Sequence, residues 1–380
     1  MFYKRRLLAP GPTPVLEEAL LASARPMIHH RTEEFNAVLK EVFEQLKSVF
    51  LTKSPVLMFT SSGTGAMEGA VANLCRSDRP SLVIRGGKFG ERWAEITKAF
   101  GVPTDVIDVP WGHAVDPAEV EAHLKKKPET TAVFTTLSET STCVAHPIRE
   151  LGAIVSKTDA VLAVDGISGL GGQECRTDDW KADVVVAGSQ KALMIPPGLA
   201  FASVSDKAWK KTKESNLPKF YFSFEKHHKN IAKDTTPYTP AVSLIFALKS
   251  ALDRMTAEGM DAIFSRHKRL GEAVRAGVQG MGLTVYSKRP VDVATAVDVP
   301  AGVDGGKLKK MFETDFGITV AGGQDSIKGK VVRIAHMGYM DPFDALAALA
   351  ALGMGLAKLG HRADIGAGVA AAVKKIQEGA

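Results

Sequence analysis

Lys191 has the surroundings of a chemically reactive amine. It follows a short apolar run, Val184 to Ala187, and a polar turn, Gly188-Ser189-Gln190, and it precedes further apolar residues and two prolines. Burial at the mouth of a strand disfavours the charged ammonium form, so the lysine pKa falls and the amine becomes a nucleophile able to form a Schiff base. Most of the 48 Lys and Arg side chains must be solvated surface charges, so this interpretation depends on what accompanies the lysine.

A glycine- and hydroxyl-rich turn, Ser61 to Gly65, separates an expected strand from an expected helix. Glycines let the backbone approach a ligand, and a helix N-terminus offers free N–H groups and partial positive charge, so the turn fits a phosphate group. It matches neither GxxxxGK[ST] nor GxGxxG, which argues against nucleoside triphosphate or dinucleotide binding. A capped helix without any ligand is the alternative, because Ser, Thr and Gly are favoured caps.

Two further charged residues end or interrupt apolar strands. Asp165 follows the run Ala160 to Val164, where a buried carboxylate needs a partner such as a protonated ring nitrogen; a turn aspartate before Gly166 is the alternative. Arg333 lies within VVRIA, where its planar guanidinium suits a bound carboxylate; an internal salt bridge is the alternative. The chemistry of pyridoxal phosphate (PLP) on an amino acid requires a phosphate site, a carboxylate for the ring nitrogen, a reactive lysine and an arginine for the substrate carboxylate. The four groups described above are together these parts.

The pattern of apolar residues predicts an α/β fold that brings these groups together. Strands and helices alternate over residues 33–204, which predicts a mainly parallel sheet with helices on both faces and ligands at the carboxyl ends of the strands. We expect strands at 56–60, 81–85, 104–108, 131–137, 160–165, 183–187 and 199–204, and helices at 33–50, 66–74, 90–99, 116–125 and 147–157.

The remaining chain predicts an arm and a second, smaller α/β unit. Residues 1–30 are expected to be irregular because of their prolines, and 215–240 to be less regular. The organisation we expect is an N-terminal arm at 1–20, a large cofactor-binding domain at 21–257 and a small C-terminal domain at 258–380. The helix expected at 241–257 ends the large domain. The small domain is expected to contain helices at 260–279, 304–316 and 342–358, strands at 283–286, 294–299 and 331–335, and a last helix within 361–380.

The sequence resembles the class V aminotransferases of fold type I, most closely the alanine–glyoxylate / serine–pyruvate aminotransferase group. The matching pieces cover most of the chain, and the SQKAL…PPG and ETST…VD segments are the more specific ones. The pieces are LAPGPTPV, HHRTEEF, SSGTGAMEGAVANL, GGKFGERW, SETSTCVAHPI, AVDGISGLGG, AGSQKALMIPPGLAF, YTPAVSL and KVVRIAHMG.

The resemblance implies a role for individual residues. Lys191 would hold PLP covalently and move the proton between substrate and cofactor, while Asp165 would pair with the pyridine nitrogen. Arg333 would bind the substrate carboxylate, with Gly11 and the rest of Pro10 to Pro14 lining the pocket. The phosphate would be held by Ser62, Gly63, Thr64 and Gln190, and the ring would be contacted by Phe89, Ser141 and Ile167. Thr239, flanked by Thr236 and Tyr238, would reach the cofactor of a neighbouring subunit, which implies a homodimer with shared sites.

The implied activity is transfer of an amino group from alanine or serine to a 2-oxo acid such as glyoxylate or pyruvate. An aspartate-type or broad-specificity class V aminotransferase is an alternative, with His29, His30 and Arg31 as candidates for binding a second carboxylate. A PLP lyase or desulfurase is disfavoured because Gln190, not histidine, precedes Lys191. A non-catalytic aminotransferase-like subunit is disfavoured because Lys191 and Arg333 are both present.

Composition argues for a globular protein that acts on small molecules. The 380 residues carry a net charge of +6, and the short lysine clusters lack interleaved aromatic residues, so we expect no nucleic-acid partner. The longest apolar run, Ala345 to Ala357, is too short to span a bilayer, and no secretory signal follows the basic N-terminus, so we expect no membrane partner. Three scattered cysteines predict neither a disulfide framework nor a zinc site and favour a cytoplasmic location.

Overall fold

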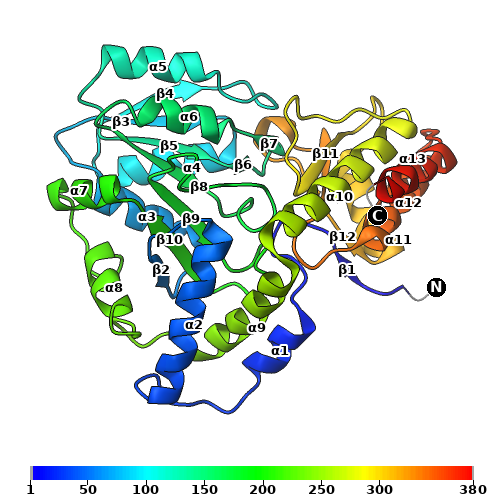
Figure 1. Ribbon diagram of the computed structural model, residues 1–380. Coiled ribbons are helices and arrows are strands. Elements are labelled where there is room, and N and C mark those ends of the chain that lie inside the picture. The colour runs from blue at the N-terminus through cyan, green and yellow to red at the C-terminus, as the bar shows by residue number, and fades with distance from the viewer. Residues whose placement is uncertain (1–2, 379–380) are drawn as a thin grey trace.

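A seven-stranded sheet between two layers of helices forms the larger part of the molecule (Figure 1). The computed structural model describes residues 3–378; residues 1, 2, 379 and 380, at the ends of the expected arm and small domain, lie outside the described residues. The strands of this sheet, in spatial order, are β2 (Val56–Phe59), β10 (Ala200–Val204), β9 (Val184–Gly188), β8 (Val161–Asp165), β5 (Ala132–Thr136), β3 (Ser81–Arg85) and β4 (Thr104–Asp108). β10 is antiparallel to both its neighbours, and the other neighbouring pairs are parallel, so the expected mainly parallel sheet is confirmed.

Helices cover both faces because the strands are apolar on both sides. In β2, Val56 and Met58 join the core on one face, whereas Leu57 and Phe59 join the core on the other. The first core is closed by α2 (Glu33–Phe50), α5 (Pro117–Lys126), α6 (Ile148–Val155) and α9 (Val242–Glu258). The second is closed by α3 (Gly63–Leu74), α4 (Lys88–Ala99), α7 (Asp206–Glu214) and α8 (Phe224–Ile231).

A smaller antiparallel sheet with its own core follows in the chain and lies to the right in Figure 1. Its strands are β11 (Ala294–Asp298), β14 (Val331–Ala335) and β13 (Ala321–Gly322). The helices that share its core are α10 (Met260–Gly280), α11 (Gly305–Phe316), α12 (Pro342–Lys358) and α13 (Ile365–Gln377). The domain boundary after residue 257 stays a prediction; in the structure α9 and α10 meet at Gly259.

The N-terminal segment is more regular than predicted and connects both parts of the molecule. β1 (Arg6–Leu7) pairs in parallel with β12 (Ile318–Thr319), and α1 (Glu17–Ser23) packs against α9 (Figure 1). The expectation of an irregular stretch over residues 1–30 is therefore wrong for these elements. The prolines before Val15 led to the prediction of an irregular segment, although a short helix follows them. Its Ala19 is fully buried in the first core, and its first turn carries two acidic residues that interact favourably with the helix dipole.

Three other expectations need correction. α3 begins at Gly63 rather than Ala66, so part of the glycine-rich turn is the first turn of the helix. The stretch 215–240 contains α8, whose N-cap Ser223 accepts a hydrogen bond from the backbone N–H of Lys226. Residues 283–286 form no strand; Val285 makes a single isolated bridge to Val297. Short polar segments of this kind gain their structure from tertiary packing, which local periodicity does not record.

The carboxyl ends of the parallel strands meet at one edge of the large sheet. β2 leads into α3, β8 ends at Asp165, and β9 leads into the segment of Lys191. β5 is followed by β6 (Ser138–Glu139), which pairs with β7 (Val144–Ala145). Among the described residues, no helix combines the length and apolar character needed to cross a membrane.

Candidate active site

A cavity of about 230 Å³ lies at this edge of the large sheet. It brings together several of the predicted site residues from segments that are far apart in sequence. Its lining comprises Gly11, Pro12, Ser62, Gly63, Thr64, Phe89, Arg92, Ile167, Ser168, Gln190, Lys191 and Pro197.

Lys191 is buried at the wall of this cavity, in the segment that follows β9. Its Nζ donates a hydrogen bond to the carbonyl oxygen of Pro10. Burial lowers the lysine pKa to about 8; the neighbouring Asp165 opposes this shift, and Arg333 and Arg92 add to it. The side chain therefore releases its proton far more readily than a surface lysine does, as a nucleophilic amine must.

The Asp165 carboxylate is buried at the end of β8, and the protein offers few groups that stabilise its negative charge. It accepts a 2.8 Å hydrogen bond from the backbone N–H of Ile167. Burial raises its pKa to about 7, an effect to which Glu139 adds and which the Ile167 N–H, Arg92 and Lys191 oppose. A positively charged ligand group placed against this carboxylate would restore the ionised form.

The first turn of α3 forms a cup with unused polar groups. Ser62 is the N-cap residue, but its hydroxyl makes no capping bond, so it is free for a ligand. Gly63 packs against Ile167 so closely that an added Cβ would overlap the isoleucine side chain. The buried Oε1 atom of Gln190 has no hydrogen-bond partner among the described residues. Free donors at a helix N-terminus suit an anion, to which the side-chain N–H groups of Gln190, not its Oε1, could add.

Phe89 and Arg92, on successive turns of α4, form another wall of the cavity. The Cζ of Arg92 lies 4.9 Å from the centroid of the Phe89 ring, and its Nη1 lies 3.4 Å from the Thr64 hydroxyl. The backbone N–H of Phe89 donates to the carboxylate of Glu139 at 3.1 Å. Glu139 therefore fixes the backbone of Phe89, and the Arg92 cation flanks the Phe89 ring.

Ser141 is close to this wall but does not line the cavity described above. Its hydroxyl donates a 2.5 Å hydrogen bond to Glu139 and accepts one from the backbone N–H of Lys88 at 3.1 Å. Glu139 is fully buried, which raises its pKa, and it also accepts from the backbone N–H groups of Ser141, Phe89 and Gly90. The structure thus places Ser141 in a network that fixes the start of α4.

Arg333 reaches from β14 of the smaller sheet toward the loop that follows β6. Its side chain is buried, which lowers its pKa. Nε donates to the carbonyl of Gly322 at 2.9 Å and Nη1 to that of Thr140 at 2.7 Å. Both acceptors within the described chain are carbonyl groups rather than carboxylates, so the internal salt bridge considered as an alternative is not what holds this side chain.

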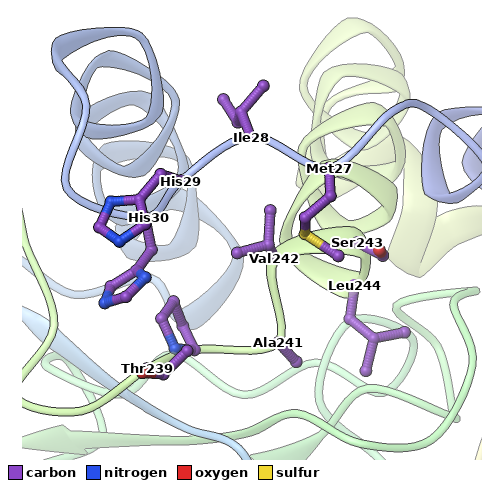
Figure 2. A pocket seen from close by; sticks show the side chains of 10 residues that line it. Met27, Ile28, His29, His30, Thr239, Ala241, Val242, Ser243 and Leu244 are labelled. Carbon is purple, nitrogen blue, oxygen red and sulfur yellow. The ribbon is translucent and has the colours of Figure 1, made fainter.

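Tyr238 and Thr239 are not brought to the Lys191 cavity within the described chain. Thr239 lines a different and larger cavity of about 550 Å³ between the segment before α2 and the start of α9 (Figure 2). His29 and His30 line the same cavity, with their rings on the Thr239 side in Figure 2, and Arg31 Nη1 donates to the carbonyl of Thr236 at 2.9 Å. The larger volume belongs to an apolar surface groove. Lys191 lines the smaller cavity, and the Asp165 carboxylate lies next to it, bonded to the N–H of Ile167 in the cavity lining, so the smaller cavity is the candidate active site.

The residues around the smaller cavity fit PLP. The cup at Ser62 to Thr64 offers donors for its phosphate, Lys191 a nucleophile for its aldehyde, and Asp165 a counter-charge for a protonated ring nitrogen. The free Ser62 hydroxyl and the poorly compensated Asp165 carboxylate are the groups that such a ligand would satisfy. Among residues 3–378, no group of three or more His, Cys, Asp or Glu side chains is arranged to hold a metal ion.

Fold and site together define a fold type I PLP-dependent enzyme, and comparison with known proteins gives the family. The model of the aminotransferase class-V family matches residues 16–342, so the chain belongs to that family. Class V aminotransferases are PLP-dependent, and the chain is a transaminase.

Three relatives illustrate the range of proteins that the chain is similar to. A protein of Synechococcus sp. (strain PCC 6716) named as the small subunit of soluble hydrogenase is 42% identical, with 97% of each chain covered. A serine–glyoxylate aminotransferase of Hyphomicrobium methylovorum is 36% identical, covering 98% of this chain and 95% of the relative. The crystal structure of pyridoxamine–pyruvate aminotransferase from Mesorhizobium loti superposes with a TM-score of 0.95 at 31% identity, covering 100% of this chain and 98% of that one.

Two charged residues of the site were missed from sequence. Arg92 lies three positions after Phe89, and this spacing places both on one face of α4; the helix expected at 90–99 began one residue too late to include Phe89. The signal for Glu139 was weaker: a charged residue inside SETST gives no indication that its carboxylate is buried beneath the start of α4.

Proposed function

We propose that this aminotransferase takes the amino group of alanine or serine and transfers it to a small 2-oxo acid such as glyoxylate or pyruvate. The observation that carries the proposal is the joint burial of the Lys191 amine and the Asp165 carboxylate beside the cup formed by α3.

The positions of the side chains around the cavity support most of the proposed roles, and the family resemblance supports that of Arg333. PLP, when bound, supplies the electron sink that makes the substrate Cα–H bond acidic. Lys191 holds the cofactor and, once its amine is released, moves the proton from Cα. Asp165 keeps the ring nitrogen protonated, and Arg333 binds the substrate carboxylate. Ser62, Gly63, Thr64 and Gln190 hold the phosphate, Phe89 and Ile167 enclose the ring, and Gly11 lines the substrate side.

We propose that Ser141 contacts the cofactor less directly than the family resemblance implies. Its hydroxyl is already paired with Glu139 and with the Lys88 N–H. To reach the phenolic oxygen of PLP it would have to exchange one of these bonds. We therefore propose that Ser141 acts mainly by fixing the start of α4, and hence Phe89.

We propose that the groove of Figure 2 forms part of the interface of a homodimer with shared active sites. Thr239 opens toward this groove, whose wall is mostly apolar, and Met27 on its rim is 70% exposed. An apolar surface of this kind is stabilised by covering it. We propose that a second copy covers it and that Thr239, with Tyr238 beside it, contacts the phosphate held by that copy. The three buried free cysteines support a reducing, cytoplasmic location, which we also propose.

The name of the Synechococcus relative raises the alternative of a non-catalytic subunit. Lys191, Asp165 and Arg333 are all present here, and the first two share one buried site, which supports catalysis. An aspartate-type specificity has less support, because Arg31 is engaged with Thr235 and Thr236.

Single amino donors mixed with the PLP-loaded protein test this proposal. We expect alanine and serine to convert the bound cofactor to its pyridoxamine form, seen as loss of the long-wavelength absorbance band, and aspartate to do so at least about tenfold more slowly. A faster reaction with aspartate would contradict the proposed donor. Failure of every amino acid, with PLP firmly bound, would favour the non-catalytic alternative.

A further inference from the structure

Arg92 is a cation in the Lys191 cavity to which no role has been given. Its half-buried side chain lines the cavity, stacks on the Phe89 ring at 4.9 Å and approaches the Thr64 hydroxyl at 3.4 Å. Within the described part of the chain it forms no ion pair, while the adjacent Glu91 pairs with Lys88. An arginine directed into a cavity without a carboxylate partner is a ready site for an anionic ligand.

The charge balance of the cavity points to a phosphate. Of the residues described as lining it, Arg92 and Lys191 carry positive side chains. Lys191 must give up its proton before its amine can attack an aldehyde and is then engaged at that end of the cofactor, and the cup residues Ser62, Gly63 and Thr64 are neutral. A phosphate group carries about −1.5 to −2 charge near pH 7, whereas a helix N-terminus offers only about half a positive charge. Burying such a group without a full cation would be costly.

Position separates this role from binding of a substrate carboxylate. Arg92 is linked to Thr64, in the first turn of α3, which is the side of the cavity where the phosphate cup lies. Arg333 approaches from the smaller sheet and is oriented by the carbonyl groups of Gly322 and Thr140. The two arginines therefore come from different elements, and the one at the cup is suited to the cofactor rather than to the amino acid.

We propose that Arg92 is a phosphate-binding residue of this enzyme, pairing with the cofactor phosphate together with the cup at Ser62 to Thr64. This inference rests on the proposed assignment of that cup to the phosphate. The same guanidinium, stacked on Phe89, also holds the aromatic ring in place over the cavity. One side chain thus connects the phosphate end of the cofactor with the residue that covers its ring.

Binding of PLP and of pyridoxal, which lacks the phosphate, to the apoenzyme tests the inference without relying on turnover. We would measure both dissociation constants for wild type, Arg92→Met and Arg92→Lys. For Arg92→Met we expect PLP binding to weaken about 10- to 100-fold, the range for a lost charge-assisted hydrogen bond, and pyridoxal binding to change less than about twofold. Arg92→Lys should recover part of the affinity for PLP. Arg149→Met, an exposed arginine on α6, is the matched control and should leave both constants unchanged.

Inorganic phosphate provides an independent measurement. It should compete with PLP for wild-type apoenzyme and compete at least about tenfold more weakly in Arg92→Met. If that variant fails to fold, as judged by its thermal unfolding, the same comparison is made with Arg92→Lys and Arg92→Gln.

Three results would overturn the inference. Equal weakening of PLP and pyridoxal would show that Arg92 acts through Phe89 alone. Unchanged PLP binding with a raised KM for a dicarboxylic donor would assign Arg92 to the substrate. Unchanged values throughout would leave it without a ligand role. Each of these differs from failure of the proposed function, in which the wild-type protein itself would not react with an amino donor.

Discussion

The carbonyl oxygen of Pro10 accepts a hydrogen bond from the Nζ of Lys191. The same arm is tied to the lysine segment by the backbone N–H of Thr13, which donates to Gln190 at 3.1 Å, and by its hydroxyl, which donates to the carbonyl of Lys191 at 2.8 Å. The N-terminal arm is therefore fixed in place over the Lys191 side chain. It positions the amine through the Pro10 carbonyl and shields it from water, and the shielding favours the neutral form.

Gly11 is the residue of this arm that should tolerate substitution least. It has φ of +127°, and an added Cβ would overlap Lys191 Nζ and lie 2.7 Å from Lys191 Cδ. We expect Gly11→Ala to reduce covalent incorporation of PLP at Lys191 by at least about tenfold, because the lysine must move away. Incorporation is measured by borohydride reduction followed by mass analysis of the Lys191 peptide.

Gly101→Ala is the matched control for that substitution. Gly101 also has a positive φ, +68°, but an added Cβ would meet nothing within 4 Å. Both variants should lose about 1 kcal/mol of stability from backbone strain, and only Gly11→Ala should lose PLP incorporation. Normal incorporation in Gly11→Ala would show that the arm does not set the position of the amine.

The pH dependence of PLP incorporation should report the lowered pKa of Lys191. With a pKa of about 8, roughly a tenth of the amine is neutral at pH 7, compared with less than about a thousandth for an exposed lysine. We expect the rate of incorporation into apoenzyme to rise about tenfold per pH unit up to pH 7 and to level off above about pH 8. A rate that keeps rising to pH 10 would mean that the lysine is not perturbed.

The same pKa predicts the sign of a stability change in the apoenzyme. Between about pH 8 and the ordinary lysine value of 10.5, the unfolded chain binds a proton at position 191 that the folded chain does not. The contribution of Lys191 to the free energy of unfolding must therefore increase as the pH rises through this window. Chemical denaturation of wild type and Lys191→Met at pH 7.5 and 9.5 measures it, and the increase should be missing from the variant.

The contribution of Asp165 to the free energy of unfolding changes with pH in the opposite direction. Its pKa of about 7 exceeds its ordinary value of 3.8, so the folded chain holds a proton between these values that the unfolded chain lacks. Its contribution is most favourable at low pH and is lost as the pH rises toward 7. Asp165→Asn should remove this dependence, making the variant apoenzyme more stable than wild type at pH 8. It should nevertheless lower kcat by at least about a hundredfold, because the neutral amide cannot keep the ring nitrogen protonated.

Asp183→Asn separates that effect from general damage to a buried carboxylate. Asp183 precedes β9 at the opposite edge of the sheet and accepts hydrogen bonds from Ser205 at 2.7 Å and Leu162 at 2.9 Å. Its replacement should lower stability but leave kcat within about threefold for the folded fraction. A similar kcat loss in both variants would argue against a special role for Asp165.

Much of the large sheet could be predicted from sequence because its strands are short apolar runs ending at chemically distinctive residues. Strands at 81–85 and 104–108 and the helix at 33–50 agree with the structure residue for residue. Asp165 and Lys191 could be proposed as partners because the ends of parallel strands meet at one edge. The α1 and α8 helices were missed, since their stability comes from packing on α9 and on the second core rather than from a long periodic pattern.

What sequence could not supply is the part of the site made by backbone atoms and by long-range contacts. The Pro10 carbonyl that holds Lys191 carries no side-chain signature. The support of Arg333 by the carbonyl of Thr140 joins residues 193 positions apart. Thr239 could be proposed as a site residue from family resemblance alone, because within one chain it lines the groove and not the Lys191 cavity.

Arg333 should control binding of the amino acid and leave the cofactor in place. We expect Arg333→Gln to raise the KM for the amino donor about 10- to 100-fold, the effect of losing a charge-assisted hydrogen bond, with PLP affinity changed less than about twofold. Arg275→Gln is the control, since Arg275 is a largely buried arginine on α10 that donates to the carbonyl of Val291 at 2.9 Å. An unchanged KM in Arg333→Gln would show that another group binds the substrate carboxylate.

Thr239 should act on the site of the partner subunit, and mixed dimers can show this. Neither Lys191→Ala nor Thr239→Asp should be active alone, the first for lack of the amine and the second because its carboxylate repels the phosphate. In a mixed dimer, a shared arrangement puts both changes into one site and leaves the other site intact. Co-expression and purification of the mixed dimer through two different tags should therefore recover activity, approaching half that of wild type. If Thr239 served its own subunit, each site of the mixed dimer would carry one change and no activity would return.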